Sequence, residues 1–426
     1  MKALIGAAVP LFLSMVSGMV AHLVGSAVLG NRSAAALAAL ALALAVYNPV
    51  VAAVAGAVRG MVPFVAPHTG DPAAALPVLK DARWLAYGVG GLGAAVMTCV
   101  PLIATASGAP GEVVAELGAL PWLLAACVVV LAAGGGANSV LIALGRSRQV
   151  LWSALAATAV EVALIVVLAP SLGVGGVGLA ALGSAAAGML VSNLALMRVP
   201  GLRGQSLRPG RPRPREIAEL ARVGLPLSAT TLVKFGALAV VTYAAAGTGT
   251  RNAAAHALLG SLAGLLMVAA LAVAQASVPE IARAADAARA RRVNRGAVLL
   301  AVTASGVGAV GLLACGEPLM GLFTSDAGVR DTALALLPLL VPASVADGWQ
   351  AVMGFGLTAL KRSSWSLGCF LLGYGMLAGV AVPVAGFAGL PGLWTAVLVM
   401  NVVLVLLQGG GFSRHSARIG MVTAGA

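Results

Sequence analysis

Charged and aromatic side chains are scarce in this chain. Of its 426 residues only 9% are charged and 4% are aromatic, whereas soluble domains carry about 25% charged residues. So few polar groups cannot cover a water-exposed surface, which argues against a soluble enzyme, a nucleic-acid-binding domain and a disordered protein. The chain is instead 60% hydrophobic, with a mean hydropathy of +1.02. This composition predicts an all-α integral membrane protein.

Sequence patterns of common catalytic sites are also missing. The chain contains no G-x-S-x-G, no H-E-x-x-H and no G-x-x-x-x-G-K-[ST] pattern. Its four cysteines form no C-x-x-C pair and share no metal-ligand spacing with a histidine. We therefore expect no enzyme activity, no cofactor and no metal site. Since the phosphate-binding loop is absent, we do not expect the chain itself to hydrolyse ATP.

Long apolar segments dominate what is present. A membrane-spanning helix needs about 20 apolar residues, and by that rule the sequence predicts twelve transmembrane helices. They lie at about 3–29, 34–64, 84–106, 119–143, 150–170, 176–197, 223–247, 253–279, 296–316, 332–359, 365–385 and 392–411.

The basic residues support this number of helices. With twelve helices, the connections alternate between two faces, and 21 of the 26 Lys and Arg residues fall on one face. Only Arg32, Arg251 and Arg330 fall on the other, and the acidic residues show no such bias. Lys and Arg collect in the cytoplasmic loops of membrane proteins. We therefore expect a multi-pass protein of the inner (plasma) membrane with both termini in the cytoplasm.

The chain also divides into two similar halves. The long polar break at 198–222 predicts a cytoplasmic linker between six-helix bundles at 1–197 and 223–411, with a tail at 412–426. IALGRSRQ near 142–149 matches TALKRSSW near 358–365, and Pro10 pairs with Pro226 at the same offset in numbering. Such pseudo-symmetric bundles usually hold a substrate cavity between them near the middle of the membrane.

Several stretches in this order resemble a known family. They are HLVGSAVLG after Pro10, VPFVAPHTGD, LGRS at 144–147, GVGGVGLAAL, GLPLS, AAAH at 253–256, LFTSD at 322–326 and VADGWQAVMGFGLTALKR at 345–362. Together they resemble the multidrug and toxic compound extrusion (MATE) transporters over nearly the whole chain. The resemblance implies two six-helix bundles that alternate between outward and inward openings. It also implies export of small organic compounds, often cationic, against an inward flow of protons or sodium ions.

Three charged residues stand out within the apolar segments, where an ionisable group is costly and usually faces a cavity or a partner. Asp347 matches the position of the family's helix-10 aspartate, and this predicts a role in cation coupling; the alternative is a structural carboxylate with a permanent partner. Lys234 stands where many relatives carry a helix-7 glutamate. It can pair with Asp347, replace a bound cation or receive an anionic part of the cargo. Glu161 is a second candidate for cation coupling, or a structural residue held by a hydroxyl group.

Uncharged polar residues complete the predicted site. Relatives with a helix-1 aspartate would carry it near Val20, where this chain has no carboxylate, which argues against a coupling site centred on that helix. The polar residues that we assign to the substrate cavity, in addition to Lys234, are Asn48, Gln275, His22, His256, Asn193 and Asn401.

Other functions remain open at this point. One alternative is a lipid-carrier flippase of the same superfamily, although a flippase cavity is expected to be more basic. Another is a membrane receptor or scaffold that keeps the fold without transporting. The expected partners are a small, amphipathic organic cargo and membrane lipids, with no nucleic acid, and we expect a monomer. The sequence leaves the cargo and the choice of coupling ion undetermined.

Overall fold

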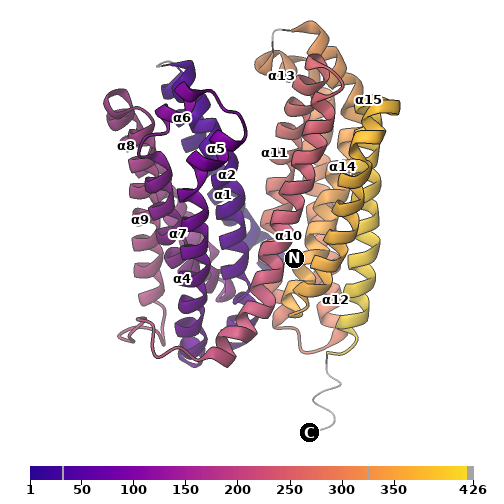
Figure 1. Cartoon of the computed structure of the whole chain (residues 1–426). Coiled ribbons are helices and arrows are strands. Elements are labelled where there is room, and N and C mark those ends of the chain that lie inside the picture. Colours follow the sequence, from indigo (N-terminus) through magenta and orange to yellow (C-terminus); the bar gives the residue numbers. More distant parts are fainter. Residues whose placement is uncertain (31–32, 325, 420–426) are drawn as a thin grey trace. The chain divides into compact units, whose positions relative to one another are not determined.

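The structure is a computed structural model in which residues 1–30, 33–324 and 326–419 are described. All secondary-structure elements of these residues are helices (Figure 1). The chain divides into two compact units. The N-terminal unit comprises Val9–Thr231, and the C-terminal unit comprises Met1–Ala8 and the residues from Leu232 onward. The boundaries lie inside helices α1 and α10, so both helices contribute to both units. The expected division at 198–222 therefore differs from the observed one.

The N-terminal unit is built from helices that run alongside one another. Its helices are α1 (Lys2–Gly30), α2 (Ala34–Arg59), α3 (Val62–Val65), α4 (Leu76–Thr98), α5 (Val100–Ala106), α6 (Gly111–Glu116), α7 (Leu120–Ala143), α8 (Ser147–Leu172), α9 (Val174–Met197) and the first part of α10 (Pro214–Ala246). Short 3-10 helices, η1 (Ala66–His68) and η2 (Pro72–Ala75), connect α3 to α4. Buried Leu, Val and Ala side chains of α2, α4, α7, α8 and α9 form its apolar core.

The C-terminal unit has a corresponding set of helices. They are the second part of α10, α11 (Thr250–Ala282), α12 (Ala287–Ala314), α13 (Gly316–Phe323), α14 (Ala327–Ala359) and α15 (Ser363–Ser416). Aspartates begin two of them: Asp286 accepts a hydrogen bond from the Arg289 amide of α12, and Asp326 accepts one from the Val329 amide of α14. Such side-chain caps satisfy amides that have no partner in the first helical turn.

The number of membrane crossings agrees with the twelve predicted. Within the described residues, ten helices are long and apolar enough to span a membrane, and the bent pair of α4 and α5 gives an eleventh. Helix α15 has 54 residues and changes direction at Gly389, whose backbone angles are not helical. At 1.5 Å per residue it would be about 80 Å long, more than twice the hydrocarbon thickness of a bilayer. Its two arms are therefore separate crossings, which brings the total to twelve.

The helix boundaries differ from the predicted ones in several places. Helix α10 begins at Pro214, inside the predicted linker, because proline is well accommodated in the first turn of a helix. Helix α4 begins at Leu76 rather than near residue 84, and α15 continues to Ser416, past the predicted start of the tail. Residues 420–426 of that predicted tail, together with Arg32 and Ser325, lie outside the described residues.

The internal repeat is visible in the backbone. Gly173 and Gly389 are equivalent positions of the two halves, and both have φ of 59° with strongly negative ψ at the junction of two helices. Gly145 and Lys361 are a second equivalent pair, and both have positive φ at the turn into the next helix. Both pairs have the offset that relates Pro10 to Pro226. The offset read from the sequence is therefore also the offset of the structural repeat.

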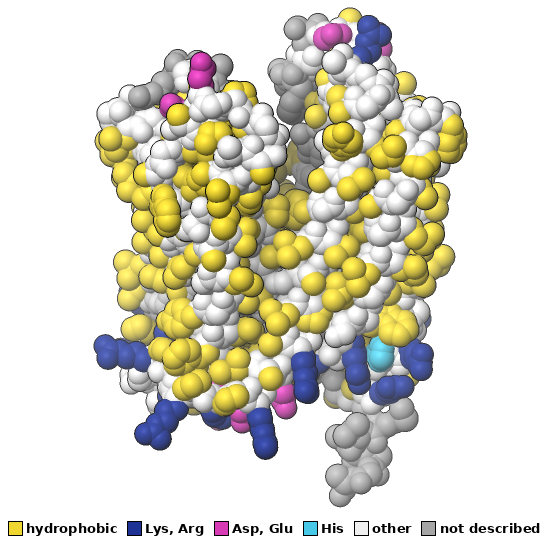
Figure 2. Space-filling model, viewed as in Figure 1, with side chains coloured by type: hydrophobic (Ala, Val, Ile, Leu, Met, Phe, Trp, Pro, Cys, Tyr) yellow, Lys and Arg dark blue, Asp and Glu magenta, His cyan; other side chains and the backbone are white. Residues whose placement is uncertain are grey.

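The surface shows the same charge pattern as the sequence. In each unit, Lys and Arg side chains gather at one end of its helices, which in the N-terminal unit is the end with the loop between α9 and α10, and we call this end of a unit its basic end (Figure 2). A broad hydrophobic region covers the length of the helices beyond it. Exposed large apolar residues such as Leu102, Trp152, Val307 and Phe387 belong to this surface. An apolar surface of this kind fits a lipid environment.

Candidate functional site

An ion pair lies inside the C-terminal unit. The Lys234 ammonium of α10 lies 2.7 Å from Oδ1 and 2.8 Å from Oδ2 of Asp347 on α14. The side chains are only 24% and 18% exposed. Each residue is twelve positions from the nearer end of its helix, or about 18 Å at 1.5 Å per residue. The two charges therefore neutralise each other deep within the apolar part of the unit.

Two further side chains complete this site. Gln350 lies three residues after Asp347 on the same face of α14, and its amide nitrogen donates to Asp347 Oδ1 over 2.8 Å. The amide oxygen of Gln350 is buried and has no hydrogen-bond partner in the part of the chain that the structure describes. Tyr374 of α15, buried to 1% exposure, interacts with both the lysine and the aspartate. We call Lys234, Asp347, Gln350 and Tyr374 the lysine–aspartate site.

This arrangement can exist in two charge states. Removing two charges from water is costly, and in a low-dielectric interior that cost is offset only if the ions stay paired. A proton that binds Asp347 would remove the negative charge and leave the ammonium without its partner. Because the paired and unpaired states differ in their electrostatics, occupancy of the carboxylate can shift an equilibrium between two conformations.

A second polar cluster lies in the N-terminal unit. The Ser184 hydroxyl of α9 donates to Glu161 Oε2 of α8 over 3.0 Å. Close by, the Tyr47 hydroxyl of α2 and the Cys127 thiol of α7 are 3.1 Å apart, and both interact electrostatically with Glu161. His22 of α1 also interacts with Glu161. The cluster places one ionisable carboxyl group near the middle of α8 and gives it a hydroxyl donor.

The other predicted cavity residues of the C-terminal unit are buried or half-buried. Gln275 of α11 is buried, and its amide nitrogen has no hydrogen-bond partner within residues 1–30, 33–324 and 326–419. Asn401 of α15 donates to the Ala343 carbonyl of α14 over 3.2 Å. The His256 ring lies 3.3 Å from the Thr242 hydroxyl and packs against Trp394. The assignment of these three residues to a substrate cavity stays a prediction.

The remaining two predicted residues have different surroundings. Asn193 of α9 accepts a hydrogen bond from Arg83 of α4 over 3.0 Å and donates to the Met189 carbonyl. It therefore joins two helices near the basic end, as a structural residue would. Asn48 of α2 is exposed. A cavity role for these two residues also stays a prediction.

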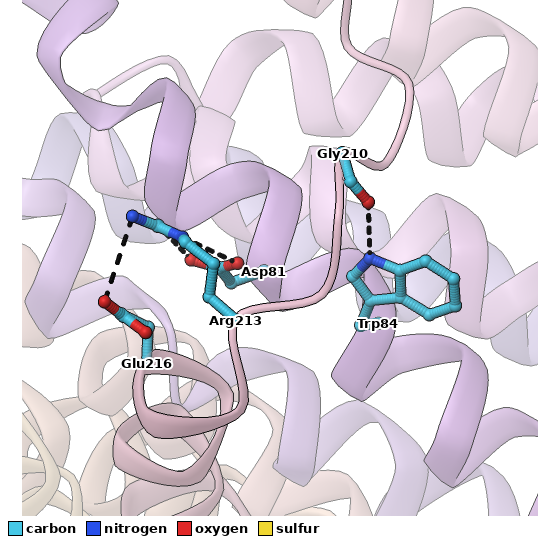
Figure 3. A network of polar contacts seen from close by, with 5 residues as sticks. All are labelled: Asp81, Trp84, Gly210, Arg213 and Glu216. Carbon is cyan, nitrogen blue, oxygen red and sulfur yellow. Dashed lines mark hydrogen bonds and ion pairs between the residues drawn. The ribbon is translucent and has the colours of Figure 1, made fainter.

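A polar network fastens the loop between α9 and α10 to α4 (Figure 3). Arg213 forms a two-pronged ion pair with Asp81, whose side chain is only 2% exposed. Glu216 lies 4.0 Å from the same guanidinium. One helical turn from Asp81, the Trp84 indole donates to the Gly210 carbonyl over 3.0 Å. The hydrogen bond to Asp81 raises the pKa of Arg213, so the guanidinium stays charged.

The sequence indicated some of these residues and missed others. It predicted functional roles for Lys234, Asp347 and Glu161 because charges are rare in apolar segments. The i, i+3 spacing of Asp347 and Gln350 places both on one face of a helix and is the signal that indicates Gln350. Tyr374 and Ser184 carry no such signal, because their roles depend on how separate helices face one another.

Comparisons with known proteins agree on one family. A profile described as MatE matches residues 226–383. A protein of Aromatoleum aromaticum named "Probable multidrug resistance protein NorM" is 26% identical over 381 residues, which cover 83% of this chain and 79% of that protein. A protein of the same name from Bradyrhizobium diazoefficiens is 27% identical over 406 residues, with coverages of 89% and 84%.

Solved structures show the same fold. A crystal structure of MATE in the bent conformation matches with a TM-score of 0.87 at 18% identity, covering 99% of this chain and 97% of that one. The Vibrio cholerae MATE transporter VcmN in the bent form matches with a TM-score of 0.84 at 20% identity, with coverages of 99% and 98%. At such identities the likeness shows the fold alone. Together with the profile and the relatives, it makes the chain similar to the MATE transporters over most of its length.

Proposed function

We propose that this protein exports small organic compounds across the inner membrane by alternating access, driven by an inward flow of protons or sodium ions. The relatives named as probable multidrug resistance proteins support an efflux role. The collection of Lys and Arg at the basic end of each unit supports a cytoplasmic position for that end and for both termini. We further propose that the protein acts as a monomer with lipids at its apolar surface.

The observation that carries the proposal is the lysine–aspartate site. The carboxylate and the ammonium lie deep within an apolar unit with little access to solvent. They form an ion pair that the binding of another ion can break. In this proposal Asp347 is the principal coupling residue, and Glu161 is a secondary one in the N-terminal unit. Lys234 affects which charged groups the site accepts.

In a single conformation, a permanent structural ion pair has the same geometry as a pair that takes part in ion coupling. A transport measurement distinguishes the two roles. We expect Asp347→Asn to abolish gradient-driven uptake of a fluorescent organic cation into inside-out proteoliposomes, because an amide neither takes up a proton nor carries charge. Asp331→Asn, at an exposed position near the start of the same helix, serves as the matched control and should transport like the wild type.

The variant must also be shown to fold, since Asp347→Asn leaves an ammonium unpaired in the apolar interior. Gel filtration and thermal unfolding in detergent address this point. A folded Asp347→Asn protein that transports at the wild-type rate under an imposed gradient would refute the coupling role and support the receptor or scaffold alternative.

A further inference from the structure

The Lys234 ammonium holds the position that a bound monovalent cation would take at Asp347. Its nitrogen is almost equidistant from the two carboxylate oxygens, at 2.7 and 2.8 Å. A cation shared between both oxygens of one carboxylate has this placement. The cation in this structure is attached to the protein through the lysine side chain.

The remaining contacts of the carboxylate are also donors. The Gln350 amide nitrogen donates to Oδ1, so that oxygen faces two N–H donors and Oδ2 faces one. Hard metal cations require several oxygen ligands that point their lone pairs at the ion. The N–H groups around the Asp347 carboxylate instead point hydrogen atoms with partial positive charge into the position that a metal ion would occupy. Sodium would therefore have to displace an ammonium that cannot diffuse away.

A proton has no such requirement. It binds a lone pair of one carboxylate oxygen and needs no coordination shell. The product is a neutral carboxylic acid, while Lys234 keeps its three protons and its charge. The ion pair is thereby lost without any other ion entering the site.

We propose that Lys234 is a tethered cation that closes the lysine–aspartate site to sodium, so that the proton is the coupling ion at Asp347. The inference rests on the proposed coupling role of Asp347 and names its ion. It makes Lys234 the residue that determines ion specificity in the C-terminal unit.

The same geometry implies that a sodium site would form at Asp347 if the Lys234 ammonium were removed. Without the ammonium, the two oxygens of Asp347 become free. Among the described residues, the buried Gln350 amide oxygen has no hydrogen-bond partner, and the Tyr374 hydroxyl group interacts electrostatically with Asp347. These groups offer four candidate oxygen ligands from two helices, once the Gln350 amide turns so that its oxygen rather than its nitrogen faces Asp347. Lys234→Gln would add an amide oxygen whose reach is one bond shorter than that of the lost ammonium.

Equilibrium binding of radioactive sodium to the purified full-length protein in detergent tests the proposal, with choline chloride keeping the ionic strength constant. Four proteins are compared: the wild type, Asp347→Asn, Lys234→Gln and the Lys234→Gln/Asp347→Asn double variant. We expect the wild type and Asp347→Asn to bind equal amounts, because sodium bound elsewhere is unaffected by Asp347. We expect Lys234→Gln to bind about one additional sodium ion per chain, and the double variant to lose it.

Two results would overturn the proposal. One is sodium binding by the wild type that Asp347→Asn removes, and the other is a folded Lys234→Gln protein that gains no sodium. Lys80→Gln, at the start of α4 in the N-terminal unit, is the matched control and should leave sodium binding unchanged. If Lys234→Gln fails to fold, the comparison of the wild type with Asp347→Asn still decides whether the native site takes sodium.

This measurement uses no cargo, so its outcome is separate from that of the proposed function. A protein that transports no compound under any gradient would refute the export proposal. The sodium-binding result would still show whether Lys234 occupies the cation position of Asp347.

Discussion

At the scale of single residues, the protein places few charges in its apolar interior, and both carboxylates of the candidate site have a partner. Asp347 faces Lys234, and Glu161 faces a serine hydroxyl. The sequence predicts that these charges matter, because an unpaired ion in hydrocarbon is costly. It does not predict the pairing, because Lys234 and Asp347 are 113 residues apart. The rotation of α10 and α14 about their axes, which packing determines, brings them together.

The two carboxyl groups differ in their partners, and this predicts different responses to substitution. Glu161 accepts from the neutral Ser184 hydroxyl, and an amide at this position keeps that hydrogen bond. We expect Glu161→Gln to fold with wild-type thermal stability and to lower gradient-driven transport several-fold, if it titrates as a secondary coupling residue. Ser184→Ala is the comparison that removes the hydrogen bond but keeps the carboxyl group. An unchanged transport rate in Glu161→Gln would assign Glu161 a structural role.

At the scale of helices, the internal repeat organises the fold. The sequence predicted its offset from Pro10 and Pro226, and the same offset relates the positive-φ positions Gly173 and Gly389. The sequence did not predict that α10 begins at Pro214, because the Pro- and Arg-rich stretch before it is typical of a loop. In the structure, the contacts of Arg213 with Asp81 and of Gly210 with Trp84 hold that stretch against α4.

The junction at Gly389 should depend on the absence of a side chain. Its φ of 59° and ψ of −152° lie in a region that only glycine readily adopts. We expect Gly389→Ala to lower the free energy of unfolding by about 1–3 kcal/mol. Gly386→Ala is the matched control, because Gly386 has no positive φ and a Cβ added there would meet open space. That change should be neutral or stabilise the helix by up to about 1 kcal/mol. Equal effects of the two changes on thermal unfolding would contradict the argument.

The ion pair between α4 and the loop before α10 should respond asymmetrically to truncation. Asp81 is almost fully buried, whereas Arg213 is 44% exposed. Arg213→Ala leaves a buried carboxylate without its cation, whereas Asp81→Asn leaves a guanidinium that water can reach. We therefore expect Arg213→Ala to lower the unfolding temperature more than Asp81→Asn does. Arg211→Ala, in the same loop, controls for loss of a positive charge. The opposite order would show that burial of Asp81 does not govern the contact.

At the scale of the whole molecule, composition and charge predicted the class of protein and its number of crossings. Twelve helices with Lys and Arg on one face follow from hydropathy and the positive-inside rule. The described helices agree once the two arms of α15 are counted separately. Composition does not identify the cargo, because recognition of a compound depends on a few side chains whose positions packing decides.

The charge bias also predicts an orientation that labelling can check. A single cysteine introduced at Ser206, in the loop between α9 and α10, should resist a membrane-impermeant thiol reagent in intact cells and react after lysis. One introduced at Ser107, after α5, should react in both. The background protein needs its four native cysteines replaced by serine or alanine. Reaction of the Ser206 position in intact cells would contradict a cytoplasmic basic end.

The central claim is that a proton on Asp347 drives export, and simultaneous measurement of cargo and proton flux tests it most directly. Purified protein is placed in liposomes that hold an acidic interior, a pH-sensitive dye and no sodium, and a fluorescent organic cation is added outside. We predict cargo uptake coupled to proton release in the wild type, with both fluxes lost in Asp347→Asn and unchanged in Asp331→Asn. Cargo uptake without proton release, or only after a sodium gradient is imposed, would contradict the account.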